Sequence, residues 1–292
     1  LEINVDEGWA RVQTGVVKDQ LNKAVKDKGL FFAPELSTSN RATIGGMINT
    51  DASGQGSVMY GKTRDHVLAL KTIFLDGTVW DSAPITDKEL QTNSQRTDYA
   101  GIIHKTVNLA YSENKQAIQD TFPVLNRCLT GYDLAHIRNN DGLFDLNSVL
   151  CGSEGTLGFI VEAKVNLLEI PKYAALVNIR YNSFEASLRH AKELLEAKPT
   201  SIETVDSTVL GLAKSDIIWD SVSRFFPQIE GEDVQGINLV EYAADSEAEL
   251  EAKMEAINAC LYDPTCYEKK GLTNVADELK KVEAEYEEVS ER

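Results

Sequence analysis

The sequence has few positively charged residues and no long apolar run, and each of these two features excludes a class of protein. Its 29 Lys and Arg are outnumbered by 46 Asp and Glu among 292 residues, which gives a formal net charge of -17. Phosphate backbones and anionic lipid surfaces repel so acidic a chain, so we expect neither nucleic acid nor a membrane surface as a partner. A membrane span needs about 18 consecutive apolar residues, and neither such a run nor a basic-then-apolar leader occurs.

Closely spaced cysteines are also lacking. The four cysteines, Cys128, Cys151, Cys260 and Cys266, show no C-x-x-C spacing. Zinc and iron–sulfur sites use such spacing, so we expect no metal within this chain. Cysteines without a pairing pattern are typical of reduced thiols, which predicts a cytoplasmic setting. The chain opens at Leu1, already inside an apparent strand, and we interpret it as a piece of a longer protein.

Residues 1–170 mix strand and helix patterns. Alternating apolar residues predict strands, and apolar residues three and four apart predict helices. Asp76-Gly77 is typical of a two-residue hairpin turn, so the sheet is expected to be antiparallel there. Residues 81–98 are polar and turn-rich. The expected elements are strands at 1–5 and 9–12, a helix capped by Thr14 and ending at Gly29, strands at 66–75 and 78–80, a helix at 100–118 and a strand at 159–168.

The composition changes after Pro171, and residues 171–292 predict a small α+β unit. A capping-box pattern at Ser246 to Glu249 predicts the start of one helix. The last residues are highly acidic, which is most simply a solvated helix face. The expected elements are strands at 176–181 and 237–242, a helix at 184–197 capped by Asn182 or Ser183, a helix at 205–214, a helix from 246 and an acidic helix at 274–292.

Residues 34–65, here called the glycine-rich segment, carry most of the functional information. They are rich in Gly, Ser, Thr and Asn and hold few long apolar side chains. Glycine lets a backbone approach a bound group, and free amide N–H groups beside short hydroxyls suit a phosphate or a flavin ring. We therefore interpret the segment as a cofactor-binding loop.

One motif within this segment has a competing interpretation. Gly56 to Thr63 fits G-x-x-x-x-G-K-[ST], the phosphate-binding loop of nucleoside triphosphatases, with Lys62 and Thr63 as its functional residues. That loop needs an apolar strand before it and a helix after it, and neither flank agrees. The G-x-G-x-x-G fingerprint of nicotinamide enzymes is absent as well. A triphosphatase stays open as the alternative function, and so does a non-catalytic scaffold module.

A second glycine cluster, residues 152–158, strengthens the flavin interpretation. Together with the stretches 43–46, 49–54 and 60–65 and the Thr-Gly-Tyr-Asp-Leu run at 130–134, it resembles the FAD-linked oxidase family, whose fold is the vanillyl-alcohol-oxidase or PCMH type. Order and spacing agree over about residues 1–170. Within the family, the chain resembles the branch of D-lactate and D-2-hydroxyglutarate dehydrogenases, especially long proteins that add an iron–sulfur region.

The resemblance implies a fold and a domain organisation. It implies an α+β fold: residues 1–170 as the second subdomain of an FAD-binding domain, an antiparallel sheet flanked by helices, and residues 171–292 as part of an α+β cap domain for the substrate. The family's upstream pyrophosphate loop and its downstream basic and metal-binding residues have no counterpart, so both domains are expected to be incomplete.

The resemblance also implies a function. It implies FAD as cofactor, a small 2-hydroxy acid as substrate, hydride transfer from its α-carbon to the flavin, and a separate electron acceptor. An iron–sulfur cluster is expected only in the parent protein, and the catalytic base is expected downstream. His66, where the glycine-rich segment meets a strand, has a flavin-proximal role or a structural one, whereas His104 and His190 are expected to be surface or partly packed residues of helices.

The residues implied to bind FAD come from three stretches. Those near 43–53 would contact the isoalloxazine ring and the ribityl or pyrophosphate region, and Asp65 with 154–161 would lie near the adenosine half. The full set is Pro34, Glu35, Ser37, Thr43, Gly45, Gly46, Asn49, Thr50, Ala52, Ser53, Gly54, Gly61, Asp65, Glu154, Gly155, Gly158, Ile160 and Val161.

Overall fold

The computed structural model describes residues 2–125, 127, 131–217, 219–226 and 233–262. It divides into two compact units, Leu1–Ile170 and Pro171–Arg292. Both combine helices with antiparallel sheets, so the expected α+β class is confirmed. No helix in the described ranges is long and apolar enough to cross a membrane.

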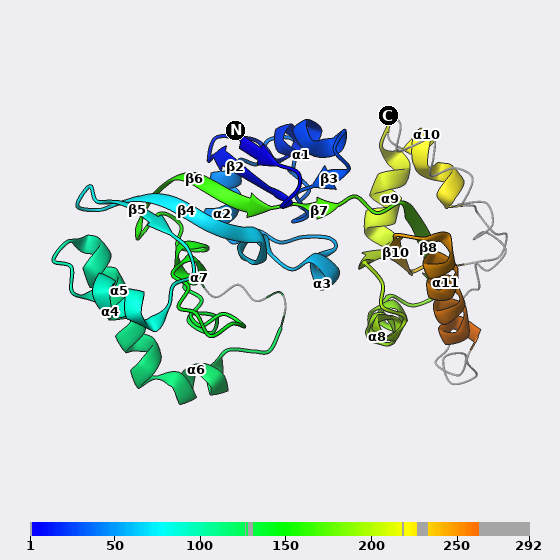
Figure 1. Ribbon diagram of the computed structural model, residues 1–292. Helices are drawn as coiled ribbons and strands as arrows, with labels where there is room; N and C mark the ends of the chain where they lie inside the picture. Colours follow the sequence, from blue (N-terminus) through cyan, green and yellow to red (C-terminus); the bar gives the residue numbers. More distant parts are fainter. Residues whose placement is uncertain (1, 126, 128–130, 218, 227–232, 263–292) are drawn as a thin grey trace. The chain divides into compact units, whose positions relative to one another are not determined.

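The first unit is built on a five-stranded antiparallel sheet (Figure 1). Its spatial order is β1 (Glu2–Asn4), β2 (Trp9–Gln13), β6 (Gly158–Asn166), β4 (Val67–Phe74) and β5 (Val79–Ser82). The hairpin between β4 and β5 turns at Asp76-Gly77, as expected, with Gly77 at a φ of +85° that glycine adopts without strain. Its loop is not the expected two-residue turn: Ile73 pairs with Val79 and the Phe74 N–H donates to Thr78 O, which leaves a three-residue loop at 75–77. A small two-stranded sheet pairs β3 (Leu30–Phe31) with β7 (Leu168–Glu169).

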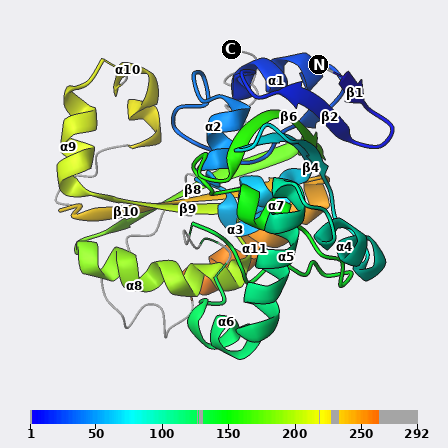
Figure 2. The ribbon, with the colours of Figure 1, turned by 90° about the vertical axis from the view of Figure 1, so that its left-hand side faces the viewer.

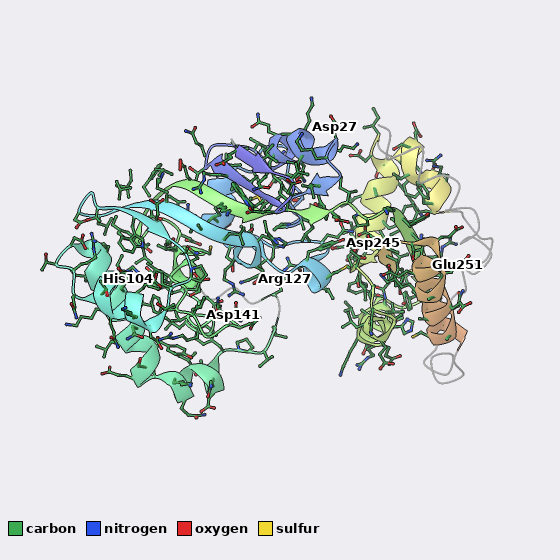
Figure 3. The ribbon with its side chains drawn as sticks, viewed as in Figure 1. Asp27, His104, Arg127, Asp141, Asp245 and Glu251 are labelled. Carbon is green, nitrogen blue, oxygen red and sulfur yellow. The ribbon has the colours of Figure 1, made fainter. Side chains whose placement is uncertain are left out.

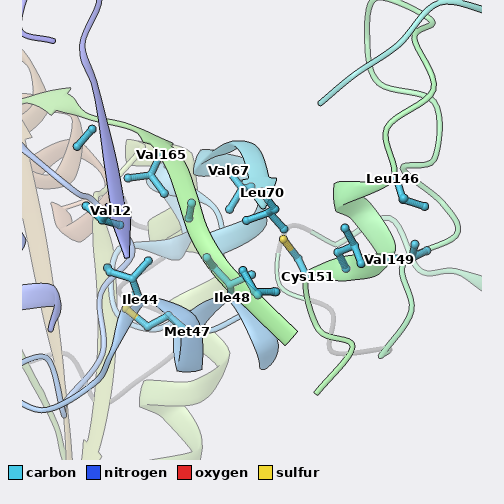
Figure 4. Packing of buried hydrophobic residues seen from close by; sticks show 14 of the residues in the cluster. Val12, Ile44, Met47, Ile48, Val67, Leu70, Leu146, Val149, Cys151 and Val165 are labelled. Atoms are coloured by element: carbon cyan, nitrogen blue, oxygen red, sulfur yellow. The ribbon is translucent and has the colours of Figure 1, made fainter. Parts of the chain in front are cut away.

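Short helices pack around this sheet, and their apolar residues form one core. Ile44, Met47 and Ile48 of one helix lie in it with Leu70 and Val165 of the strands, as Figure 4 shows. The helical elements are α1 (Lys18–Lys26), α2 (Ile44–Asn49), α3 (Ser57–Tyr60), the 3-10 helix η1 (Thr63–His66), α4 (Asp87–Ser94), α5 (Tyr99–Glu113), α6 (Lys115–Thr121) and α7 (Asn147–Leu150).

Three expectations for this unit are corrected. Helix α1 is capped at Val17, not Thr14, because the Thr14 hydroxyl donates to Ile160 O instead. The turn-rich stretch 81–98 contains α4, whose start is a capping box between Thr86 and Glu89. The single helix expected at 100–118 is two, because Asn114 leaves the helical conformation between α5 and α6.

The second unit is a three-stranded antiparallel sheet with helices on its two sides. Its order is β8 (Tyr173–Tyr181), β10 (Gly236–Ala244) and β9 (Ser201–Asp206). Figures 1 and 2 both draw α8 (Phe184–Leu194) on one side of these strands and α9 (Ser207–Ser215) with α10 (Trp219–Val222) on the other. The remaining elements are the 3-10 helices η2 (Leu195–Ala197) and η3 (Ser223–Phe225) and the helix α11 (Glu247–Tyr262).

The core of this unit lies between the sheet and its helices. Val177, Val240 and Tyr242 of the strands are fully buried with Leu194 of α8 and Ile257 of α11. Side chains of β8 and β10 at every second position therefore face these helices, as the alternation of a strand requires.

One element of the second unit differs from expectation. Val205 lies in β9, and the following helix begins only at Ser207, where the Asp206 carboxylate accepts the Val209 N–H at 2.7 Å. Of the two candidate caps for α8, the structure uses Ser183. Helix α11 has one half of the expected capping box, since the Ser246 hydroxyl accepts the Glu249 N–H at 3.2 Å, while the Glu249 carboxylate accepts the N–H of Asp245 at 3.1 Å. The acidic helix expected at 274–292 lies outside the described residues.

Candidate cofactor site

The glycine-rich segment is anchored by the short helix α2. Ile44, Met47 and Ile48 are at most 2% exposed, so the face they share is fixed in the core. The opposite face carries Gly46 and Thr50, which are both exposed. The spacing of the apolar residues thus turns the small polar residues outward, where a ligand can reach them.

Most amide N–H groups at the start of α2 already have acceptors inside the protein. Ile44 N–H donates to Val16 O at 2.8 Å, Gly45 N–H to Thr14 O at 2.9 Å and Gly46 N–H to the Thr43 hydroxyl at 3.2 Å. The sequence suggested these amides as flavin donors. The start of α2 therefore offers a ligand the exposed surface of Gly46 and the hydroxyl of Thr43 more than its own amides.

Open backbone donors lie elsewhere in the site. Within the described residues, no acceptor faces the N–H groups of Thr43, Ser53, Gly54 or Gly155. Asn49 adds an open acceptor, since its Oδ1 is buried without a hydrogen-bond partner in the same part of the chain. Donors and an acceptor held by a fixed backbone suit a polar cofactor with a flat heterocycle and a hydroxylated chain.

The second glycine cluster lies directly against α2. Gly152 N–H donates to Ile48 O at 2.8 Å, and Glu154 N–H donates to Asn49 O at 3.0 Å. Thr14 N–H donates to Val161 O at 3.3 Å. Two stretches about a hundred residues apart in sequence thus form one continuous backbone surface, as the resemblance implies.

The glycines of this surface serve two different purposes. A Cβ at Gly45 would lie 2.6 Å from Thr14 Cβ, one at Gly158 would lie 2.7 Å from Ile73 O, and one at Gly54 would strike Glu35 O. These three glycines are needed for the packing of the protein itself. Gly155, in contrast, meets nothing within 4 Å and has a φ of +79°. With Gly46, it leaves open backbone on the outside of the segment.

A network of charges holds the end of the glycine-rich segment. Asp51, which is 6% exposed, pairs with the ammonium of Lys62 and accepts the Arg64 N–H at 2.9 Å. The Arg64 guanidinium contacts both Asp133 and Asp65. Since Asp133 lies in the loop before the second cluster, these pairs join the two halves of the site.

The same network sets several protonation states. Burial alone would raise the pKa of Asp65, but the hydrogen bond from Lys62 N–H and the Arg64 guanidinium hold it below its ordinary value. Burial and Arg64 lower the pKa of His136. Burial raises the pKa of the Cys151 thiol well above its ordinary value, so this thiol stays protonated and unreactive.

The geometry of Gly56 to Thr63 does not match a triphosphate loop. Lys62 is 4% exposed and its ammonium pairs with Asp51, and the Thr63 hydroxyl donates to Ala52 O at 2.7 Å. The four-residue helix α3 and the 3-10 helix η1 occupy the stretch. A triphosphate loop requires its lysine and hydroxyl to face the ligand, and here both face the protein.

Three of the four histidines are buried, which corrects the surface or partly packed positions expected for His104 and His190. His104, labelled in Figure 3, is 1% exposed and meets Trp80 edge to face, with ring centroids 5.0 Å apart. His190 is 6% exposed and bonds the Tyr181 hydroxyl at 2.7 Å. His66 contacts Tyr60 O and Asn166 Oδ1, both at 2.7 Å, which favours the structural role among its two alternatives.

All residues implied to bind FAD are described, and they differ in exposure. The exposed ones are Ser37, Gly46, Thr50, Asp65, Glu154 and Gly155. The partly buried ones are Glu35, Thr43, Asn49, Ala52, Ser53, Gly54, Gly61 and Val161. The fully buried ones, which support the surface from behind, are Pro34, Gly45, Gly158 and Ile160.

Sequence reasoning missed several residues that build this surface. Thr14 ties α2 to β6, and Lys18 pairs with Glu35 at 3.0 Å. Asp133 belongs to the Thr-Gly-Tyr-Asp-Leu run, so its motif could have placed it in the site. Nothing in the local sequence distinguishes Thr14 or Lys18, because their partners are far away in the chain or on a separate loop.

Comparison with known families identifies both units. Residues 1–83 match the model of an FAD binding domain, and residues 170–284 match the C-terminal domain of FAD linked oxidases. The chain belongs to the FAD-linked oxidase family. The expected cofactor, FAD, is confirmed by the first of these matches.

Similar proteins support the same family. D-2-hydroxyglutarate dehydrogenase of Pseudomonas putida is 56% identical over 273 residues, which cover 94% of this chain and 27% of that protein. The enzyme of the same name from Escherichia coli is 47% identical, with 98% and 28% covered. Glycolate oxidase subunit GlcD of Bacillus subtilis is 27% identical over 72% of this chain and 34% of its own length. The chain thus spans little more than a quarter of the two dehydrogenases.

A solved structure shares the fold. Alkyldihydroxyacetonephosphate synthase superimposes with a TM-score of 0.57 at 14% identity, covering 93% of this chain and 40% of that one. At this identity the likeness shows the fold alone.

Proposed function

We propose that this chain is part of an FAD-dependent oxidoreductase that oxidises a D-2-hydroxy acid of the D-2-hydroxyglutarate or D-lactate type. The observation that carries the proposal is the 56% identity to a D-2-hydroxyglutarate dehydrogenase over 94% of the chain. The meeting of the two glycine-rich stretches on one backbone surface supports it independently.

The residues of the first unit fit the cofactor. We assign the open N–H groups of Thr43, Ser53, Gly54 and Gly155 to polar atoms of FAD, and the exposed backbone of Gly46 to a ring or chain packed against it. When bound, FAD would accept the hydride, which is one proton with two electrons, from the α-carbon. The protein binds and orients the cofactor, and its fixed donors stabilise negative charge on it.

We further propose a division of labour between the units. Residues 1–170 hold FAD, and residues 171–292 belong to the cap domain for the substrate, which is a small 2-hydroxy acid. The two family matches on either side of residue 170 support this division. The electron acceptor is a separate molecule or a fused region of the parent protein, where we also place any iron–sulfur cluster.

A reducing, cytoplasmic setting remains a prediction. Cys151 is a free thiol in the structure, and Cys128 and Cys266 lie outside the described residues. The two other functional hypotheses are weaker. Lys62 is buried and paired with Asp51, which removes the main support for a triphosphatase. The match to an FAD binding domain favours a cofactor-binding role over a non-catalytic scaffold.

The proposal is tested by flavin binding and flavin reduction. We would titrate FAD into the 292-residue chain and into a version extended at both ends within its gene, following flavin absorbance. The expected result is FAD uptake, followed by anaerobic bleaching of the flavin by D-2-hydroxyglutarate or D-lactate but not by the L enantiomers. If neither version takes up FAD, or if only L enantiomers bleach the flavin, the proposal is wrong.

The same preparation decides the alternatives. Tight Mg-ATP binding that is lost in Lys62→Ala would support the triphosphatase. A chain that folds but binds neither FAD nor nucleotide in either version would support a scaffold role.

A further inference from the structure

A half-buried ion pair joins the first residues of the glycine-rich segment to helix α1. Lys18, at the start of α1, is 2% exposed, and its Nζ lies 3.0 Å from Oε1 of Glu35. The Glu35 side chain is 43% exposed. A lysine is seldom buried this completely without a partner, so the pair fixes the position of the Glu35 carboxylate.

Only one of the two Glu35 oxygens is used. Oε1 is held by Lys18, while Oε2 has no hydrogen-bond partner within the described residues. A carboxylate held on one side and open on the other is an oriented acceptor. It is aimed by the protein and available to a ligand.

The backbone of Glu35 adjoins residues with open donors. The backbone of Glu35 packs so closely on Gly54 that a side chain at 54 would strike Glu35 O. The N–H groups of Gly54 and its neighbour Ser53 have no acceptor in the described part of the chain. Adjoining residues therefore offer a charged acceptor and two neutral donors.

This combination selects the kind of ligand group. A hydroxyl both donates and accepts, so it can satisfy a carboxylate and an amide N–H together. A phosphate can only accept at its charged oxygens, and a nearby carboxylate repels it. The chemistry at Glu35 and Gly54 therefore suits the hydroxylated parts of FAD and not its pyrophosphate.

We propose that Glu35 Oε2 accepts a hydrogen bond from a hydroxyl of FAD, in the ribityl chain or in the adenosine ribose, and that Lys18 is the positioning residue that aims Glu35. This inference rests on the proposed function, since it presupposes that the site binds FAD. It narrows the ribityl-or-pyrophosphate assignment that the sequence left open for this region.

The test uses FAD and analogues that lack one hydroxyl, either in the ribityl chain or in the adenosine ribose. Dissociation constants are measured by flavin absorbance and fluorescence titration for the wild type and for Glu35→Gln. Because a hydrogen bond to a charged group stabilises a complex more than one to a neutral group, we expect FAD to bind about tenfold more weakly to Glu35→Gln than to the wild type. The analogue that lacks the contacted hydroxyl should bind equally to wild type and variant, and it identifies which sugar is held.

Lys18 provides an independent arm of the test. Lys18→Met should weaken FAD binding by a similar factor, and Lys18→Arg should restore most of it, because the guanidinium can hold the same oxygen. For the analogue that lacks the contacted hydroxyl, neither Glu35→Gln nor Lys18→Met should change the dissociation constant. A general loss of stability would instead weaken the binding of every analogue. If Lys18→Met fails to fold, Glu35→Gln, whose side chain is partly exposed, still decides. Glu2→Gln, which alters a surface pair with Arg11, is the matched control.

The outcomes separate the inference from the proposed function. A wild type that takes up no FAD overturns the proposed function. A wild type that binds FAD while Glu35→Gln binds it equally well overturns only the inference. The inference also fails if Glu35→Gln loses the same factor for every analogue.

Discussion

The buried pair between Lys62 and Asp51 gives the sharpest test of what the phosphate-loop match means. Their side chains are only 6% and 8% exposed. Replacing Lys62 by Met leaves the Asp51 carboxylate buried, with the Arg64 N–H at 2.9 Å as a remaining partner. Removing one member of a buried ion pair typically costs ~3–5 kcal/mol of the free energy of unfolding. For a unit of this size that corresponds to a drop of roughly 6–20 °C in Tm.

The measurement is urea unfolding of Lys62→Met beside two comparison variants. Lys71→Met breaks a more exposed pair with Glu162, in which the two side chains are 33% and 27% exposed, so it should destabilise the protein far less than Lys62→Met. The double variant Asp51→Asn with Lys62→Met should be more stable than Lys62→Met alone, because no uncompensated charge remains. Asn suits position 51, where φ is +46°, since it tolerates the left-handed conformation.

The reasoning is refuted if Lys62→Met unfolds at the same urea concentration as Lys71→Met. It is also refuted if the double variant is no more stable than the single one. In either case Lys62 would not be a structural cation, and its availability to a phosphate would have to be reconsidered.

Two further predictions concern packing and pH. Gly45→Ala should destabilise the protein by ~1–3 kcal/mol, because its Cβ would lie 2.6 Å from Thr14 Cβ. Urea unfolding beside Gly15→Ala, whose Cβ would meet no atom within 4 Å and whose φ is not positive, measures the difference. Burial lowers the pKa of His104 below its ordinary value near 6.5, so its neutral form is favoured in the folded state. Stability should therefore be full above pH 6.5 and fall as the pH drops below it, since the unfolded chain takes up the proton first. In His104→Phe, the free energy of unfolding should fall less steeply between about pH 7 and 5 than in the wild type, as measured by unfolding curves at each pH. If the two proteins lose stability equally over this range, His104 is not the group responsible.

The sequence alone was sufficient for several elements that depend only on neighbouring residues. The hairpin at Asp76-Gly77 and the helix opened by Ser246 both follow from short-range rules, and the structure has them. The same kind of signal was present at Thr86 and Glu89, a capping box that would have revealed α4. That helix was missed because its polar composition outweighed its cap.

Elements that depend on distant partners could not be obtained this way. Val205 has the apolar spacing of a helix, yet it pairs with Ile237 in the sheet, and pairing with β10 outweighs the local pattern. His104 lies in a helix of ordinary appearance, and only the packing of Trp80 and Phe144 against it makes it a core residue. Burial of this kind is a property of the fold and not of the helix.

The candidate site combines both situations. Its location was evident from composition, because no other stretch concentrates small polar residues so strongly. Its contacts were not, since Thr14 and Lys18 act on residues to which the sequence gives no link. The resemblance to a family supplied that missing link by relating stretches a hundred residues apart.

The glycines show why composition can locate a ligand site without describing it. Gly45 and Gly46 are adjacent residues of the same type. A side chain at Gly45 would nevertheless collide with Thr14, while Gly46 is exposed. The first lets two segments of the protein approach, and the second leaves backbone open to a ligand. The distinction exists only when the neighbouring segment is in place. A glycine-rich stretch is therefore better evidence for close backbone approach than for the identity of what approaches. Here the argument for FAD rests on the unoccupied donors at Ser53, Gly54 and Gly155 and on the family match, not on the number of glycines.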